Sequence, residues 1–302
     1  MFRMLGNPNF VESVDRRQQI GNLLEQNMNN ENTMGSPVLI LNRLRQTLAG
    51  IDTSFRPTMP GGVREVGFDP GIDAVLGGGL ACSALHELSP TGPVHLAAAT
   101  GFALALAARS GGSRGETLWI LTDFAACEAG GPYGPGLDMF GVSAARLVVL
   151  RVARPVDVLW AMEEALRCCA LSSVVAELTG EGEDADLTAT RRLSLAAREG
   201  NSTCLGLLLR HSAPSMPSAA ATRWTVAAAS SQPDRFGGLG PARFDLSLVK
   251  NRRGACGRWT VTWDRYEHWD HHEHVFHPAI PVGVAAASLD RSDRAPLRHT
   301  GS

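Results

Sequence analysis

Buried strands alternate with helices along most of the chain, and this alternation constrains the fold more than any other feature. Residues 86–109, HELSPTGPVHLAAATGFALALAAR, predict a strand, a short loop and an apolar helix. The same order continues downstream, with strands expected at 117–123, 145–152, 172–178 and 202–211, and helices at 156–171 and 187–200. Strands that alternate with helices of this length form a mostly parallel sheet covered by helices on both faces.

Towards the C-terminus the pattern changes to the two-residue period of half-buried strands. Three segments alternate apolar and polar residues and are joined by short turns: TRWTVAAAS (222–230), RFDLSLVKN (243–251) and GRWTVTWD (257–264). Short connections between such strands indicate antiparallel pairing. The sequence therefore predicts an α/β fold, with a mostly parallel sheet flanked by helices and an antiparallel C-terminal edge.

The two ends of the chain differ from this core in composition. Residues 1–33 hold seven of the ten asparagines and no alanine, and Met34 follows them. We expect a disordered or mis-started extension there, with a weak amphipathic helix over Phe10–Leu24 as the alternative. The other expected parts are an N-terminal helix and linker (34–67), the α/β core (68–277) and a disordered tail (278–302).

Composition indicates a globular protein without a general affinity for polyanions. The formal net charge is −2, and 27 of the 28 basic residues are arginines, so contact with nucleic acid would need a local basic patch. The six cysteines form no C-x-x-C motif and no secretory signal is apparent, which predicts mostly buried, reduced thiols in the cytoplasm. The longest apolar run, Leu96–Ala108, is shorter than the roughly 20 residues that span a bilayer, so we expect no membrane segment.

The segment FDPGIDAVLGGGLACSALHEL, residues 68–88, predicts a short helix, a glycine turn and a strand. Ile72, Val75 and Leu76 form one apolar helix face, and Gly77–Gly79 permit a tight turn with positive φ that residues with a Cβ resist. An ordinary glycine turn between helix and strand is the alternative. The order resembles the entry to a RecA-type core, where the same elements lead into the phosphate-binding loop.

A narrower resemblance covers residues 36–275. GGGLACSALHEL, AATGFALALAAR, YGPGLDMFGV and FDLSLVKNRRGACGRWTVTWD occur in an order that resembles the ImuA family of RecA-like, damage-inducible mutagenesis proteins of bacteria. The resemblance implies a RecA-like core and an accessory role in SOS-induced, error-prone translesion DNA synthesis. It implies as partners an ImuB-type inactive relative of Y-family polymerases, an error-prone DnaE-type polymerase complex and RecA. Self-association and direct DNA contact stay open.

The phosphate loop expected from this resemblance lacks its central residues. A P-loop places Lys and Ser or Thr at the helix start, where they meet the nucleotide's phosphates and Mg²⁺. An ungapped count from the preceding strand puts Leu96 and Ala97 there, whereas aligning GFALALA with the helix start puts Phe102 there. Gly92 and Gly101 are kept, and the N–H groups of a helix N-terminus can still bind an anion weakly. In either alignment we expect no ATP hydrolysis and no cofactor.

Three acidic residues occupy places where RecA-like cores carry functional carboxylates. Glu177 ends the strand SSVVAEL, where a Walker-B-like strand would have an aspartate, and Asp123 and Glu128 follow another strand. Without the P-loop lysine we treat all three as vestigial. Asp123 is then expected to cap a helix and Glu128 to be a solvated loop charge.

The one local basic cluster lies at the turn after FDLSLV and contains Lys250, Arg252, Arg253 and Arg258. In RecA-like oligomers the corresponding residues can reach a neighbour's phosphates. The resemblance therefore makes them candidate contacts to a partner's acidic face or to DNA phosphate, and a solvated hairpin turn is the alternative.

The histidine-rich stretch HWDHHEHVFH, residues 268–277, has the density of a transition-metal site. Its spacing matches no closed structural site, so we expect a solvated strand end and no metal. No Ser-His-Asp order, H-E-x-x-H motif or Cys-His pairing stands out elsewhere.

The sequence thus predicts a non-catalytic accessory factor that acts through protein surfaces. Two alternatives are a SulA-like cell-division inhibitor, and a RecA-like ATPase that acts on DNA.

Overall fold

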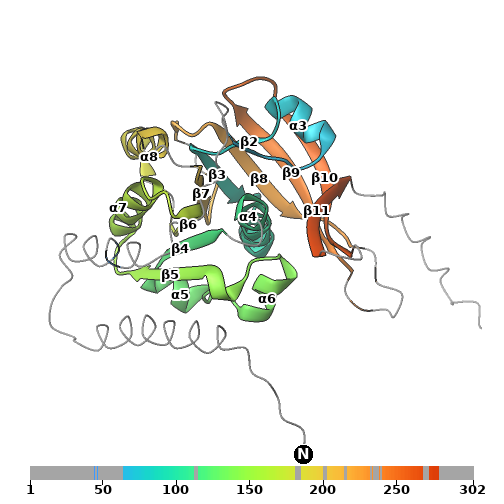
Figure 1. Ribbon diagram of the computed structural model, residues 1–302, viewed down its shortest axis with the longest axis horizontal. Coiled ribbons are helices and arrows are strands. Elements are labelled where there is room, and N and C mark those ends of the chain that lie inside the picture. The colour runs from blue at the N-terminus through green and yellow to red at the C-terminus, as the bar shows by residue number, and fades with distance from the viewer. Residues whose placement is uncertain are drawn as a thin grey trace, which may run out of the picture.

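A nine-stranded sheet with helices on both faces forms the body of the protein (Figure 1). The computed structural model describes residues 44, 46, 64–111, 115–180, 185–199, 203–213, 216–231, 233, 238, 240–267 and 272–278. The strands are β1 (Glu65–Val66), β2 (Leu80–Ala81), β3 (Ala84–Pro90), β4 (Glu116–Thr122), β5 (Leu147–Val152), β6 (Leu171–Leu178), β7 (Leu205–Arg210), β8 (Thr222–Ala228), β9 (Ala242–Asn251), β10 (Gly257–Glu267) and β11 (His272–Pro278). The helices are α3 (Pro70–Leu76), α4 (Leu96–Gly111), α5 (Asp123–Glu128), α6 (Gly134–Met139), α7 (Pro155–Leu166) and α8 (Leu187–Glu199), with 3₁₀ turns at Pro93–His95 and Ala144–Arg146.

The strand order is β11-β10-β9-β8-β3-β7-β6-β4-β5. In this sheet order, the neighbouring strands β8-β3-β7-β6-β4-β5 all pair in parallel. The neighbouring strands β11-β10-β9-β8 all pair antiparallel. Every residue of β6 and β7 is buried, as expected for parallel strands covered on both faces, whereas β8 alternates buried and half-buried residues. The predicted α/β class, mostly parallel sheet and antiparallel C-terminal edge are confirmed.

The sheet separates two hydrophobic cores. On one face α4 packs with α3 against the central and C-terminal strands, and on the other face α7 and α8 pack against the parallel strands (Figure 1). Leu44, in the part of the predicted N-terminal helix that is described, is helical and buried in the second core.

Helix α4 is apolar on nearly all sides because it lies between the sheet and α6. Phe102, fully buried in its middle, packs against Phe68, Trp224 and Phe244, with ring centroids 5.7, 6.2 and 5.8 Å away. Aromatic contacts of this kind add to the burial of apolar area. The cluster joins α4 to β8 and β9, and so joins the parallel half of the sheet to the antiparallel half.

The glycine turn before β3 has the predicted backbone conformation. Gly77, Gly78 and Gly79 have φ values of 78°, 128° and 134°. A Cβ on Gly79 would lie 2.6 Å from the carbonyl oxygen of Val66 in β1. Only glycine therefore lets β2 pair with β1 at this point.

Some element boundaries differ from the sequence prediction. The helix expected over 156–171 ends at Leu166, where its last turn tightens into i→i−3 hydrogen bonds before β6 begins at Leu171. The end of the expected linker, Glu65–Val66, is a strand, because it pairs with β2. The cysteines are also less buried than expected: Cys82 and Cys204 are buried and Cys168 is half-buried, but Cys127, Cys169 and Cys256 are exposed.

Several expectations concern residues outside the described ranges. These include the extension over 1–33, most of the segment 34–67 and nearly all of the tail over 278–302. None of the described helices is both long enough and apolar enough to cross a membrane.

Candidate functional site: the loop between β3 and α4 and its cavity

The loop between β3 and α4 has the strand–loop–helix geometry expected of a phosphate loop. β3 ends at Pro90, the 3₁₀ turn Pro93–His95 follows, and α4 begins at Leu96. Leu96 and Ala97 thus occupy the first two positions of the helix, where a P-loop has its lysine and hydroxyl. Leu96 and Ala97 offer only apolar side chains at these two positions.

The backbone of this loop has few N–H groups to offer a phosphate. Thr91 donates its N–H to the carbonyl of Val226 in β8, and His95 donates to Gly92. The N–H of Leu96 bonds to Pro93, which itself has no N–H. Three of the loop's N–H groups, those of Thr91, His95 and Leu96, are therefore engaged in internal hydrogen bonds, and Pro93 has none.

The other alignment, which puts Phe102 at the position of the P-loop lysine, falls in the middle of α4. Phe102 belongs to the aromatic cluster, and a Cβ on Gly101 would lie 2.6 Å from Cζ of Phe140. Gly101 is thus explained by the close approach of α4 to the Phe140 ring. Gly92 has an extended backbone and open space around it, so neither φ nor packing requires a glycine there.

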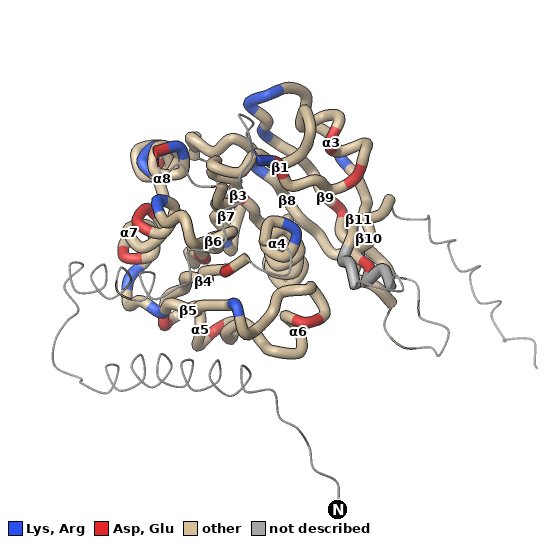
Figure 2. Tube along the Cα trace, viewed as in Figure 1, with Lys and Arg blue, Asp and Glu red and all other residues tan. Residues whose placement is uncertain are grey.

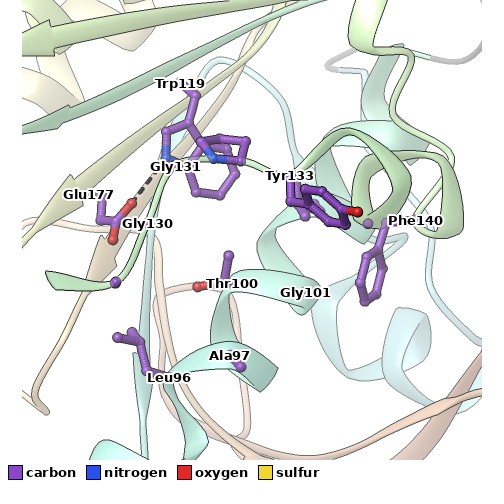
Figure 3. A pocket seen from close by; sticks show the side chains of 14 residues that line it. Leu96, Ala97, Thr100, Gly101, Trp119, Gly130, Gly131, Tyr133, Phe140 and Glu177 are labelled. Atoms are coloured by element: carbon purple, nitrogen blue, oxygen red, sulfur yellow. Dashed lines mark hydrogen bonds between the residues drawn. The ribbon is translucent and has the colours of Figure 1, made fainter. Parts of the chain in front are cut away.

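A cavity of about 330 Å³ lies beside the N-terminal part of α4. One wall is α4, with Leu96, Ala97 and Thr100, and the opposite wall is Trp119 of β4 and Glu177 of β6 (Figure 3). The third side is the glycine-rich segment 129–136 together with Phe140, which follows α6. The cavity thus lies where the carboxyl ends of the parallel strands meet the helix, the usual ligand position in α/β sheets.

Glu177 is the only carboxylate among the residues that line this cavity. It is 5% exposed, its Oε2 accepts a hydrogen bond from Trp119 Nε1 at 3.1 Å, and its Oε1 lies 2.6 Å from His211 Nε2 (Figure 3). These two groups hold the side chain in one orientation. Of the three predicted acidic positions, the structure brings only Glu177 next to the degenerate loop.

Asp123 and Glu128 lie away from the cavity lining. Asp123 is the first residue of α5 and pairs with Arg151 at 2.9 Å, while the helix is capped by the hydroxyl of Thr122, which accepts the N–H of Ala125. Glu128 is exposed at the end of the same helix.

A second buried carboxylate, Glu87 of β3, was not singled out in the sequence. Its side chain is 1% exposed and pairs with Arg210 at 3.0 Å and with Arg223 at 2.8 Å. Both arginines also donate to backbone carbonyls, Arg210 to Ala185 and Arg223 to Met216. The sequence signal was a charge inside each of three strands, but both arginines are more than a hundred positions from Glu87.

His86, next to Glu87, is also fully enclosed. One ring nitrogen bonds to the carbonyl of Ala81 at 2.9 Å and the other to the hydroxyl of Thr222 at 2.8 Å. Burial lowers the pKa of His86 to about 4, and Arg253 adds to this shift. The imidazole is therefore neutral at pH 7.

Of the four residues in the predicted basic cluster, Lys250 is half-buried and Arg252, Arg253 and Arg258 are exposed. The register of β8 and β9 shifts so that Arg223 pairs with Lys250 and Trp224 with Leu248, which leaves Val249 as a bulge. Lys250 donates to the carbonyl of Ser218, and burial, together with Arg252 and Arg223, lowers its pKa.

The other basic residues of the turn are exposed, and one of them forms an ion pair. Arg253 pairs with Glu65 of β1, whereas Arg252 and Arg258 have exposed side chains. Asn251 fixes the turn through bonds to the carbonyls of Val75 and Ala255. Figure 2 shows the basic residues of this turn near α3.

The histidine-rich stretch is partly described, and its second half forms β11, paired with β10. No group of three or more metal-ligating side chains occurs among the residues that the structure describes.

Comparison with known proteins adds a family. No protein-family model matches the chain. Over 242 residues it is 30% identical to Protein ImuA of *Caulobacter vibrioides*, in strain NA1000 / CB15N and in strain ATCC 19089 / CIP 103742 / CB 15. The aligned region covers 74% of this chain and 93% of the relative. The chain therefore belongs to the ImuA family.

Proposed function

We propose that this protein is a non-catalytic accessory factor in damage-inducible, error-prone translesion DNA synthesis. Membership of the ImuA family supports the link to damage-inducible mutagenesis. The partners we propose are an ImuB-type inactive polymerase relative, an error-prone DnaE-type polymerase complex and RecA, reached through protein surfaces in the cytoplasm.

The start of α4 carries the non-catalytic part of this proposal. Leu96 and Ala97 stand where a RecA-like ATPase needs a cation for the β- and γ-phosphates and a hydroxyl for Mg²⁺. The loop amides of Thr91 and His95 are engaged in internal hydrogen bonds. The missing charge and the engaged amides both support a loop that does not promote phosphoryl transfer.

The strand order also supports a RecA-like ancestry. β3 lies in the interior of the sheet, the phosphate loop leaves its carboxyl end, and Glu177 ends β6 two strands away. This arrangement keeps the framework of a nucleotide site and loses its chemistry.

ATP turnover by the purified full chain, with and without single-stranded DNA, tests the proposal. We expect no turnover above background, and none in a Leu96→Lys/Ala97→Thr variant, because restoring two side chains does not free the loop amides. A steady turnover of the wild type that disappears in Glu177→Ala would contradict the proposal and favour the RecA-like ATPase.

A further inference from the structure

The cavity beside α4 is larger than a packing defect. A cavity of about 150 Å³ lined by apolar side chains is enough to hold benzene, and this one has about 330 Å³. It is also at the lower end of the size range of ligand pockets, about 300–1,000 Å³. Its size fits one long or aromatic side chain better than a nucleotide.

Three exposed apolar side chains either line this cavity or lie within two residues of a lining residue in sequence. Tyr133 lines it and is 73% exposed, Val94 precedes Leu96 by two residues and is 85% exposed, and Met139 precedes Phe140 and is 70% exposed. Large apolar side chains that gather around a pocket mark an interaction surface more often than scattered ones do. Aromatic and Met residues are also enriched in protein interfaces.

The deep end of the cavity is charged. Glu177 is held by Trp119 and His211, and each of its oxygens keeps a further lone pair, since a carboxylate can accept about four hydrogen bonds. An apolar occupant would bury this carboxylate further without giving it a new donor, which is unfavourable. A cationic occupant with several N–H groups satisfies it.

We propose that the cavity receives an arginine side chain of a protein partner, with the guanidinium on Glu177 and apolar residues of the partner on Val94, Tyr133 and Met139. This inference rests on the proposed function, in which the chain acts through protein contacts. A guanidinium can donate two parallel hydrogen bonds to a carboxylate, is weakly hydrated and stacks on aromatic rings. Trp119, beside Glu177, and Tyr133 and Phe140, towards the other end of the cavity, supply such rings (Figure 3).

The glycine segment offers a way to close the cavity without straining the fold. A Cβ on Gly131 would meet no atom within 4 Å, and Gly131 is not among the glycines with positive φ. Gly131→Leu is therefore expected to fold and to place a side chain over the cavity. Glu128→Gln, an exposed carboxylate outside the lining, serves as the matched control for Glu177→Gln.

The first experiment uses the full chain labelled at its tryptophan indole nitrogens and follows the Trp119 N–H signal, assigned with Trp119→Phe. We titrate acetyl-Leu-Arg-Leu-amide and the matched acetyl-Leu-Gln-Leu-amide. The arginine peptide is expected to shift the signal saturably and to bind about tenfold more tightly, as expected for charge-assisted hydrogen bonds. Glu177→Gln should remove this difference, Gly131→Leu should weaken both peptides, and Glu128→Gln should change neither.

Equal affinity of the two peptides for the wild type, or no saturable shift with either, would overturn the proposal. A preference for arginine that survives in Glu177→Gln would also overturn it, because the cation would then bind elsewhere.

A second experiment separates this inference from the proposed function. The full chain is titrated with a purified ImuB-type protein. Loss of binding in both Glu177→Gln and Gly131→Leu supports the arginine-accepting cavity. Unchanged binding in both variants refutes the cavity as the docking site and leaves the proposed function standing. If the wild type binds none of the cassette proteins while the peptide result holds, the proposed function fails and the cavity site stands.

Discussion

Glu87, in the middle of β3, and Glu177, near the carboxyl end of β6, are both nearly inaccessible carboxylates of parallel strands, but they face opposite sides of the sheet. Glu87 shares its face with Leu85 and the α7–α8 core, where two arginines enclose it. Glu177 shares its face with Val175 and the α4 core, where an indole and an imidazole hold it beside a cavity. Burial alone therefore does not distinguish a structural charge from one that can bind; the partners and the adjoining space do.

The largest expected effect is on the free energy of unfolding, which should fall much further in Glu87→Gln than in Glu177→Gln. Glu87→Gln leaves Arg210 and Arg223 without a counter-charge in a buried site, and should lower the free energy of unfolding by about 3–5 kcal/mol. Glu177→Gln weakens the hydrogen bonds to Trp119 and His211, and should lower the free energy of unfolding by only about 1 kcal/mol. Urea denaturation of the two variants checks this, and equal losses would contradict the distinction between the sites.

Acid should act through His86, which precedes Glu87 in β3 and therefore faces the α4 side of the sheet. The folded-state pKa of about 4 lies below the unfolded value near 6.5, so only the unfolded chain takes up this proton as the pH falls between those values. The stability that the neutral imidazole provides is complete above pH 6.5 and decreases below it. The expected loss between pH 7 and pH 5 is about 2 kcal/mol.

Thermal or urea denaturation at several pH values measures this loss. His86→Gln, which keeps a donor and an acceptor but does not titrate, should give a flatter dependence between pH 5 and 6.5. A dependence as steep as that of the wild type would assign the effect to other groups.

The smallest expected stability losses are at the basic turn, where the charges are exposed, unlike those of Glu87 and Glu177. Arg253 pairs with Glu65, whereas Arg252 is exposed, so Arg253→Ala should lower stability by at most about 1 kcal/mol and Arg252→Ala by less. Together the two substitutions should leave folding intact and weaken partner or filament binding by about 1–3 kcal/mol, with a lower salt dependence. Binding curves at low and high salt test this. Identical affinities and salt slopes would make the turn a solvated hairpin end.

Much of the fold could be predicted because local patterns specify it. The fully apolar strands β6 and β7, the alternating β8 and β9 and the glycines before β3 each carry a signal within about ten residues. The β1 strand could not be predicted, because a two-residue strand has no periodicity. The early end of α7 was missed because Arg167 and Cys168 continue a helical pattern that only the start of β6 interrupts.

The site was predicted in part. The sequence pattern placed Leu96 and Ala97 at a helix start and Glu177 near a strand end, and the structure has them there. The cavity, the carboxylate held by Trp119 and His211, and the pairing of Glu87 with Arg210 and Arg223 depend on contacts between strands far apart in sequence. The basic turn shows the same limit: the sequence grouped its four cations, but the bulge at Val249 and the ion pair of Arg253 with Glu65 depend on contacts between strands.

The position of β3 in the sheet has a consequence for the chain as it leaves the ribosome. β3 is complete at Pro90, yet both of its partner strands, β7 and β8, begin more than a hundred residues later. At roughly 5–20 residues per second, the apolar β3 and α4 wait about 6–25 s for β7 to be synthesised. During that interval they have no sheet to join, so a slow or stalled ribosome between these points should favour chaperone capture and aggregation of this protein over its folding.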